Sequence, residues 1–260
     1  MRDKTDFYNI VLYTLILLAF SGLLLLLHFV FVTAGDYWIV FSQFAPALTV
    51  IFLLAIRRNK RAILDVKRVF RINKKVLTYS VFAALFVFVV LGGFGFILSV
   101  FGKPFSEWEI PVLKWETPSL AISFICLTAG CISEEVGWRG FLLPALNRNL
   151  SLIVSSLFLG IFWGVGHLDF GNGIAGFLVT VLFLTVLSVI IAWFQIKSGG
   201  SIIPAIVLHF FVNFFARSTL FDMSLSAHFA LTLLLCLFGA ILFFADRKTF
   251  MSKENAASYH

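Results

Sequence analysis

Long apolar runs separated by short polar segments dominate the chain. A helix needs roughly 20 mostly apolar residues to cross the hydrocarbon core of a bilayer. Backbone polar groups in lipid must be satisfied within their own segment, so these runs form helices and not open strands. The pattern predicts an all-α, polytopic membrane helix bundle with eight transmembrane helices. Their expected ranges are 9–33, 37–56, 76–101, 120–144, 151–168, 174–196, 201–217 and 225–244.

Basic residues are divided unevenly between the two ends of these expected helices. The side that carries both termini holds sixteen Lys and Arg, nine of them in the 57–75 loop, and the opposite side holds three. Cytoplasmic loops of membrane proteins carry such an excess. We therefore expect both termini in the cytoplasm. Without an internal repeat or a separate soluble segment, residues 1–260 are expected to form a single integral membrane domain.

The amino-acid composition supports a membrane protein and excludes a soluble domain. Hydrophobic residues make up 60% of the chain and charged residues 13%, against about 25% charged in soluble domains. A soluble domain of this size has too much surface to hide so many apolar side chains. The net charge of +7 lies largely in one loop, which favours contact with anionic lipid. The expected partners are the lipid bilayer and a membrane-associated protein or peptide, with no nucleic acid.

Ionisable residues inside the apolar runs mark the candidate site. A charge at the bilayer centre costs about 2.5–3.5 kcal/mol on insertion scales, so such residues are functional candidates by default. The fourth expected helix carries Glu134, Glu135 and Arg139. Glu135 and Arg139 are four residues apart and can pair on one face, as a structural ion pair that supports the helix. Glu134 points about 100° around the helix axis from Glu135 and has no expected partner on its own helix, so it is the candidate for catalysis.

Two further helices add imidazoles and an amide. His167 ends the fifth expected helix, and His209 and Asn213 are four residues apart on the seventh. A lone histidine in the eighth, His228, has no acidic neighbour at helical spacing and is expected to be a packing residue. Burying four polar groups at one membrane depth costs free energy, so we expect Glu134, His167, His209 and Asn213 to have a function.

A carboxylate with an imidazole can deprotonate water, and two donors on a facing helix can hold an oxyanion. This combination fits hydrolysis of an amide bond. The chain has no G-x-S-x-G nucleophile elbow and no H-E-x-x-H zinc motif. By residue type alone, Glu134, His167 and His209 would also satisfy a metal site with two histidines and one glutamate. No cofactor is firmly predicted, and a divalent metal such as zinc stays an open alternative.

Three motifs then make a resemblance specific. Glu134-Glu135-x-x-x-Arg139, Trp163-x-x-x-His167 and His209-x-x-x-Asn213 resemble, in order, the signature motifs of the CPBP family. These are the CaaX proteases and bacteriocin-processing enzymes, also called Abi proteins, which include the type II CaaX prenyl endopeptidase. The resemblance covers about 120–217. One departure is Trp163, because the second motif usually has Phe at that place.

The resemblance implies an intramembrane endopeptidase acting on a membrane-associated substrate, prenylated or CaaX-like, or related to bacteriocins. It implies that Glu134 and His167 activate water, that His209 and Asn213 stabilise the oxyanion, and that Glu135 and Arg139 support the site. Family members include both glutamate-type and metal-dependent proteases. Compact loops favour a bacterial plasma-membrane member. Two alternatives stay open: a non-catalytic immunity or scaffold protein, and a proton-coupled transporter.

Overall fold

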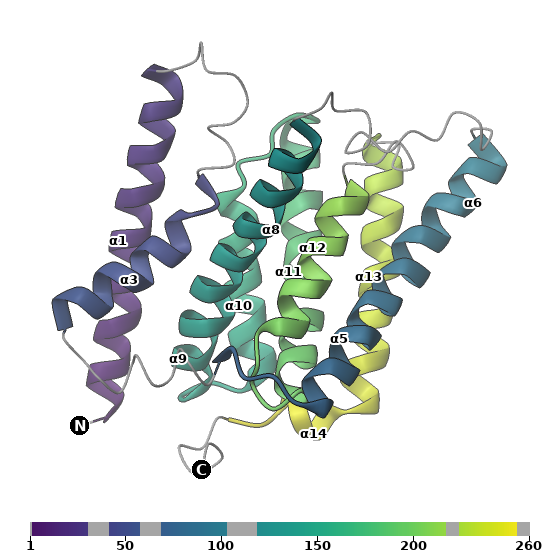
Figure 1. Cartoon of the computed structure of the whole chain (residues 1–260). Coiled ribbons are helices and arrows are strands. Elements are labelled where there is room, and N and C mark those ends of the chain that lie inside the picture. Colours follow the sequence, from purple (N-terminus) through teal and green to yellow (C-terminus); the bar gives the residue numbers. More distant parts are fainter. Residues whose placement is uncertain (1, 31–41, 58–68, 103–118, 217–223, 254–260) are drawn as a thin grey trace.

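The computed structural model describes residues 2–30, 42–57, 69–102, 119–216 and 224–253 (Figure 1). These segments are helical, with turns between them, and include no strand. An all-α fold is therefore confirmed for the part of the chain that is described.

Helices lie at each of the eight expected positions, although several boundaries differ. In the described part, α3 of the second expected range begins at Ala45, after a turn at residues 43–44; residues 37–41 lie outside the described part. The helices are α1 (Arg2–Val30), α3 (Ala45–Arg57), α5 (Lys74–Val87) with α6 (Gly93–Gly102), α8 (Ser119–Gly137) with α9 (Leu143–Asn147), α10 (Leu152–Gly166), α11 (Gly173–Lys197), α12 (Ile203–Ala216), α13 (Leu225–Ala245) and the short α14 (Arg247–Phe250).

Length and apolar composition qualify four of the described helices to cross a membrane. Three further apolar helices are shorter, at 45–56, 152–166 and 203–216. The four longer stretches are Phe7–Leu27, Lys74–Leu98, Gly173–Lys197 and Leu225–Ala245.

One end of the bundle gathers the start of α1 and the short α14 (Figure 1). Arg71, just before α5, donates to the Gly199 carbonyl after α11. Lys197 at the end of α11 forms a salt bridge of 3.0 Å with Asp246, between α13 and α14. Partial burial raises the pKa of Asp246, but hydrogen bonds, including those from Lys197 and Trp193, outweigh this and bring it below the ordinary value.

The α10–α11 pair forms the rigid centre that positions the site. A Cβ at Gly160 would lie 2.5 Å from the Thr185 Cα, and one at Gly164 would lie 2.7 Å from the Val181 Cα. Only glycine lets the two backbones approach this closely, the small-residue packing expected between membrane helices. Gly164, in the last turn of α10, therefore lies directly against Val181 of α11.

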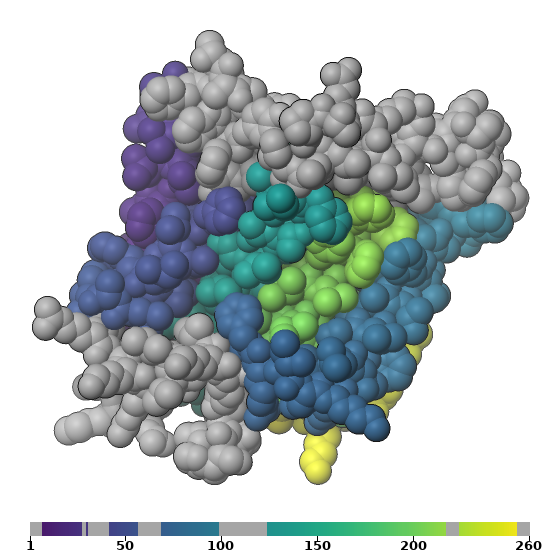
Figure 2. Space-filling view, viewed as in Figure 1, coloured from purple at the N-terminus to yellow at the C-terminus, as the bar shows by residue number. Residues whose placement is uncertain are grey.

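Two long helices contain a π-helical turn. Phe88–Gly92 (η2) joins α5 to α6, and Trp138–Leu142 (η4) joins α8 to α9, directly after the acidic residues of α8. Figure 2 shows α3, α8, α12 and the α5–α6 helix forming one continuous face. Large exposed apolar side chains on these helices, as a lipid-facing surface requires, include Ile51, Phe52, Phe82, Phe124 and Ile125.

Candidate functional site

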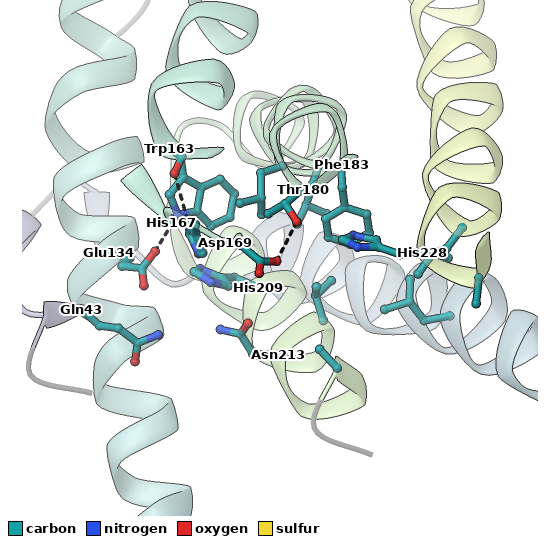
Figure 3. A pocket seen from close by; sticks show the side chains of 17 residues that line it. Gln43, Glu134, Trp163, His167, Asp169, Thr180, Phe183, His209, Asn213 and His228 are labelled. Carbon is teal, nitrogen blue, oxygen red and sulfur yellow. Dashed lines mark hydrogen bonds between the residues drawn. The ribbon is translucent and has the colours of Figure 1, made fainter. Parts of the chain in front are cut away.

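One cavity of about 180 Å³ lies among α8, α10, α11, α12 and α13 (Figure 3). Its lining includes Glu134 from α8, His167 from the end of α10, and His209 and Asn213 from α12. The structure therefore brings together the four side chains singled out by the sequence, although three separate stretches of chain supply them. Apolar residues of η2, α11, α12 and α13 form much of the remaining wall.

Trp163 connects the members of this group. Its indole N–H donates to Glu134 Oε2 at 2.8 Å, and its backbone carbonyl lies 2.9 Å from His167 Nδ1. Its ring also makes an edge contact with the His209 ring, with centroids 5.1 Å apart. Trp163 is buried in α10, where glycine packing against α11 fixes it. Trp163 thus orients the Glu134 carboxylate through its indole and the His167 imidazole through its backbone carbonyl, and its ring contacts the second imidazole.

Glu135 and Arg139 form the expected i,i+4 ion pair, and Glu135 also binds His209, which the sequence did not predict. Arg139 Nη1 and His209 Nδ1 lie 2.9 and 2.8 Å from the same oxygen, Glu135 Oε1. Arg139 also lies over the Trp163 ring, 4.8 Å from its centroid. The side chains of Glu135, Arg139 and His209 are at most 3% exposed. The pair does not line the cavity, but it holds a residue that does.

Hydrogen-bond partners restrict the ring protonation of both histidines. A backbone carbonyl and an ionised carboxylate only accept hydrogen bonds, so each Nδ1 carries a proton and donates. In neutral His167, Nε2 then has a free lone pair and can accept a proton. In His209, Nε2 accepts when the ring is neutral and donates when the ring is protonated, with Glu135 as the counter-charge.

His167 and Asp169 lie in the turn that follows α10. Both are exposed, and Leu168 between them has a φ of 48°, which is uncommon for a residue other than glycine. The Asp169 carboxylate accepts a hydrogen bond of 2.8 Å from Thr180 Oγ1 on α11. This strained turn ties the end of α10 to α11 and keeps His167 at the cavity.

Several lining residues were not identified from the sequence. Asp169 and Thr180 are among them, and His228, expected to be a packing residue, lines the far end of the cavity beside Phe183. Gln43, which precedes α3, lines the near end beside Glu134 (Figure 3). Polar residues inside apolar runs were the available signal, but spacing along one helix does not reveal partners on another.

The divalent-metal alternative concerns Glu134, His167 and His209, which line one cavity. Among the described residues, no three His, Cys, Asp or Glu side chains are grouped so that they could hold a metal ion. Each of the three has one polar atom engaged by a neighbouring residue, and a histidine that binds a metal usually makes such a hydrogen bond with its other ring nitrogen, so the metal alternative stays a prediction.

Fold and site together define a class: an all-helical, multi-pass membrane protein whose helices bring an acid, imidazoles and an amide to one cavity. Comparisons with known proteins narrow this class. The family model for type II CAAX prenyl endopeptidase Rce1-like proteins matches residues 115–215. A protein of Methanococcus maripaludis, CAAX prenyl protease 2, is 27% identical over 240 residues, which cover 85% of this chain and 86% of that protein. These findings confirm the resemblance to the CPBP-family proteases.

Proposed function

We propose that the protein is an intramembrane endopeptidase that hydrolyses a peptide bond of a membrane-associated substrate. The observation that carries the proposal is the convergence of Glu134, His167, His209 and Asn213 on one cavity. The resemblance to CPBP-family proteases supports the reaction class. A prenylated or CaaX-like protein, or a bacteriocin-related peptide, is the substrate class that we propose.

In this mechanism Glu134 and His167 activate a water molecule. Trp163 holds one Glu134 oxygen, which leaves the other free to take a proton from water. His167 Nε2 accepts a hydrogen bond from the same water and orients it. The water oxygen attacks the carbonyl carbon, the C–N bond breaks, and Glu134 returns its proton to the departing nitrogen.

The facing helix α12 would stabilise the oxyanion. Asn213 contributes its amide, whose Nδ2 lies 3.4 Å from Cys131 Sγ. His209 donates from Nε2 in its protonated form, which is paired with Glu135. Glu135 and Arg139 therefore position His209 and do not contact the substrate. Preorganised donors of this kind contribute roughly 10²–10³ in kcat in other hydrolases.

We also propose the finer topology: eight transmembrane helices in a single domain, residues 1–260, with the protease core at about 120–217. Both termini would lie in the cytoplasm, in a bacterial plasma membrane. The start of α1 and α14 at one end of the bundle support this arrangement (Figure 1). Reporter fusions at the two termini test it, because an external signal from either terminus would contradict it.

Cleavage of fluorescence-quenched peptides and prenyl-peptides by the purified protein in lipid nanodiscs tests the activity. We expect Glu134→Gln and His167→Ala to lose cleavage. The matched control is Asp246→Asn, a carboxylate that does not line the cavity. Cleavage by both site variants at the parent rate would refute the enzymatic proposal. Proton-coupled uptake into liposomes that is lost in Glu134→Gln would favour a transporter instead.

A further inference from the structure

Two glycines of α8 lie on the same helix face as Glu134. Gly130, Glu134 and Gly137 are four and three residues apart, so at about 100° per residue they fall within about 60° of one another. A Cβ at Gly130 would overlap the Gln43 carboxamide, and one at Gly137 would lie 2.9 Å from the backbone carbonyl carbon of Pro46. The segment before and at the start of α3 therefore packs directly on the helix face that carries Glu134.

This packing fixes the orientation of the Gln43 side chain. Its Oε1 is buried, lies against Gly130 and has no hydrogen-bond partner within the described part of the chain. The amide nitrogen is turned towards the side of the cavity where Asn213 lies (Figure 3). The carboxamide thus offers hydrogen-bond donors to the cavity, next to the carboxylate that we propose as the base.

The chemistry of the cavity restricts the acceptor that Gln43 can bind. Two carboxylates, Glu134 and Asp169, also line the cavity, which disfavours an anion. A neutral carbonyl oxygen is an acceptor without that repulsion, and each residue of a peptide carries one. If Gln43 served only to fill space against Gly130, an apolar side chain would do so without burying an unpaired amide oxygen.

We propose that Gln43 forms a binding subsite for the peptide backbone of the substrate. Its amide N–H donates to a carbonyl oxygen of a residue beside the bond to be cleaved, and so holds the peptide across Glu134. The inference rests on the proposed endopeptidase function and extends it. The segment that supplies Gln43 lies outside residues 115–215, the part matched by the family model. Because the contact exists before and during the reaction, it contributes to substrate binding and leaves the chemical step unchanged.

Two variants test the subsite from opposite sides. Gln43→Leu removes the donors but keeps an apolar side chain against Gly130, and Gly130→Ala displaces the intact carboxamide. We expect each to raise KM about three- to tenfold at unchanged kcat, the effect of one neutral hydrogen bond. Gly140→Ala is the matched control, since its Cβ would meet only ordinary contacts of 3.6 Å or more. An unchanged KM in Gln43→Leu, or a fall confined to kcat, would overturn the subsite.

A binding measurement separates this inference from the proposed function. In Glu134→Gln protein, the affinity of a fluorescein-labelled farnesyl-peptide is measured with and without Gln43→Leu. A three- to tenfold weaker Kd with Gln43→Leu supports the subsite even if the parent protein cleaves no peptide, in which case only the endopeptidase proposal fails. An equal Kd, or no binding of the probe, refutes the subsite even if the parent cleaves. Thermal unfolding identifies any variant that is merely misfolded.

Discussion

Replacing Glu135 with glutamine would separate its structural role from its role in the site. One Glu135 oxygen holds both Arg139 and His209, and all three side chains are buried. Removing one charge of a buried pair leaves the other uncompensated and costs about 3–5 kcal/mol. Since 1 kcal/mol shifts the melting midpoint of a chain this size by about 2–4 °C, we expect a fall of roughly 10 °C in nanodiscs. Nε and Nη2 of Arg139 have no partner among the described residues, which limits compensation.

The double variant Glu135→Gln/Arg139→Met gives the decisive comparison. Removing both charges leaves no unpaired guanidinium in the core, so we expect more than half of the lost melting temperature to return. Cleavage should stay at least tenfold below the parent, because His209 still lacks its counter-charge. Recovery of both stability and cleavage would show that Glu135 is only a structural partner of Arg139. An unchanged melting midpoint in the single variant would refute the energetic reasoning.

Three further outcomes are expected. Trp163→Phe keeps an aromatic ring but removes the indole donor from the proposed base, so kcat/KM should fall about tenfold or more, as for a hydrogen bond to a charged group; peptide cleavage measures this. Gly164→Ala should lower the melting midpoint, because its Cβ would meet the Val181 backbone at 2.7 Å; Gly22→Ala, with open space around it, is the control. The pKa of Asp246 is lowered in the folded protein, so its pairing with Lys197 stabilises the fold at pH values above the unfolded-state pKa of Asp246. This stabilisation disappears as the pH falls through the folded-state pKa. On acidification, the melting midpoint of the parent should therefore fall more than that of Asp246→Asn.

Apolar runs predicted where the helices lie, because lipid allows few other structures. Boundaries were less predictable: the second helix was expected to run unbroken over 37–56, but a turn at residues 43–44 precedes α3. The π-helical turns were not predicted either. They depend on how neighbouring helices pack, and the hydrophobic pattern of a single segment carries no record of that.

Polar residues in apolar runs led to four side chains that share one cavity, since burial of a polar group requires a hydrogen-bond partner or a functional role. Glu134, His167, His209 and Asn213 line one cavity, as expected. The sequence did not reveal which groups bond to which, because Trp163 and Glu134 are 29 residues apart and their contact is tertiary. The catalytic roles of Glu134, His167, His209 and Asn213, and the absence or presence of a metal, stay predictions.

The π-helical turn η4 has a consequence for changes in chain length. Such a turn encloses one residue more than an α-helical turn, and η4 comes directly after the residues that carry the carboxylates. A π-helical turn and an α-helical turn each complete about one revolution, so deleting a single residue between Trp138 and Leu142 would let a regular α-helix run through with α9 close to its present rotation relative to Glu134. The same deletion in a regular α-helical turn would rotate the part that follows by about 100°. Single-residue deletions should thus be tolerated better within η4 than in the regular turns of α8 and α12 that carry the candidate site, a pattern that a single-residue deletion scan would reveal.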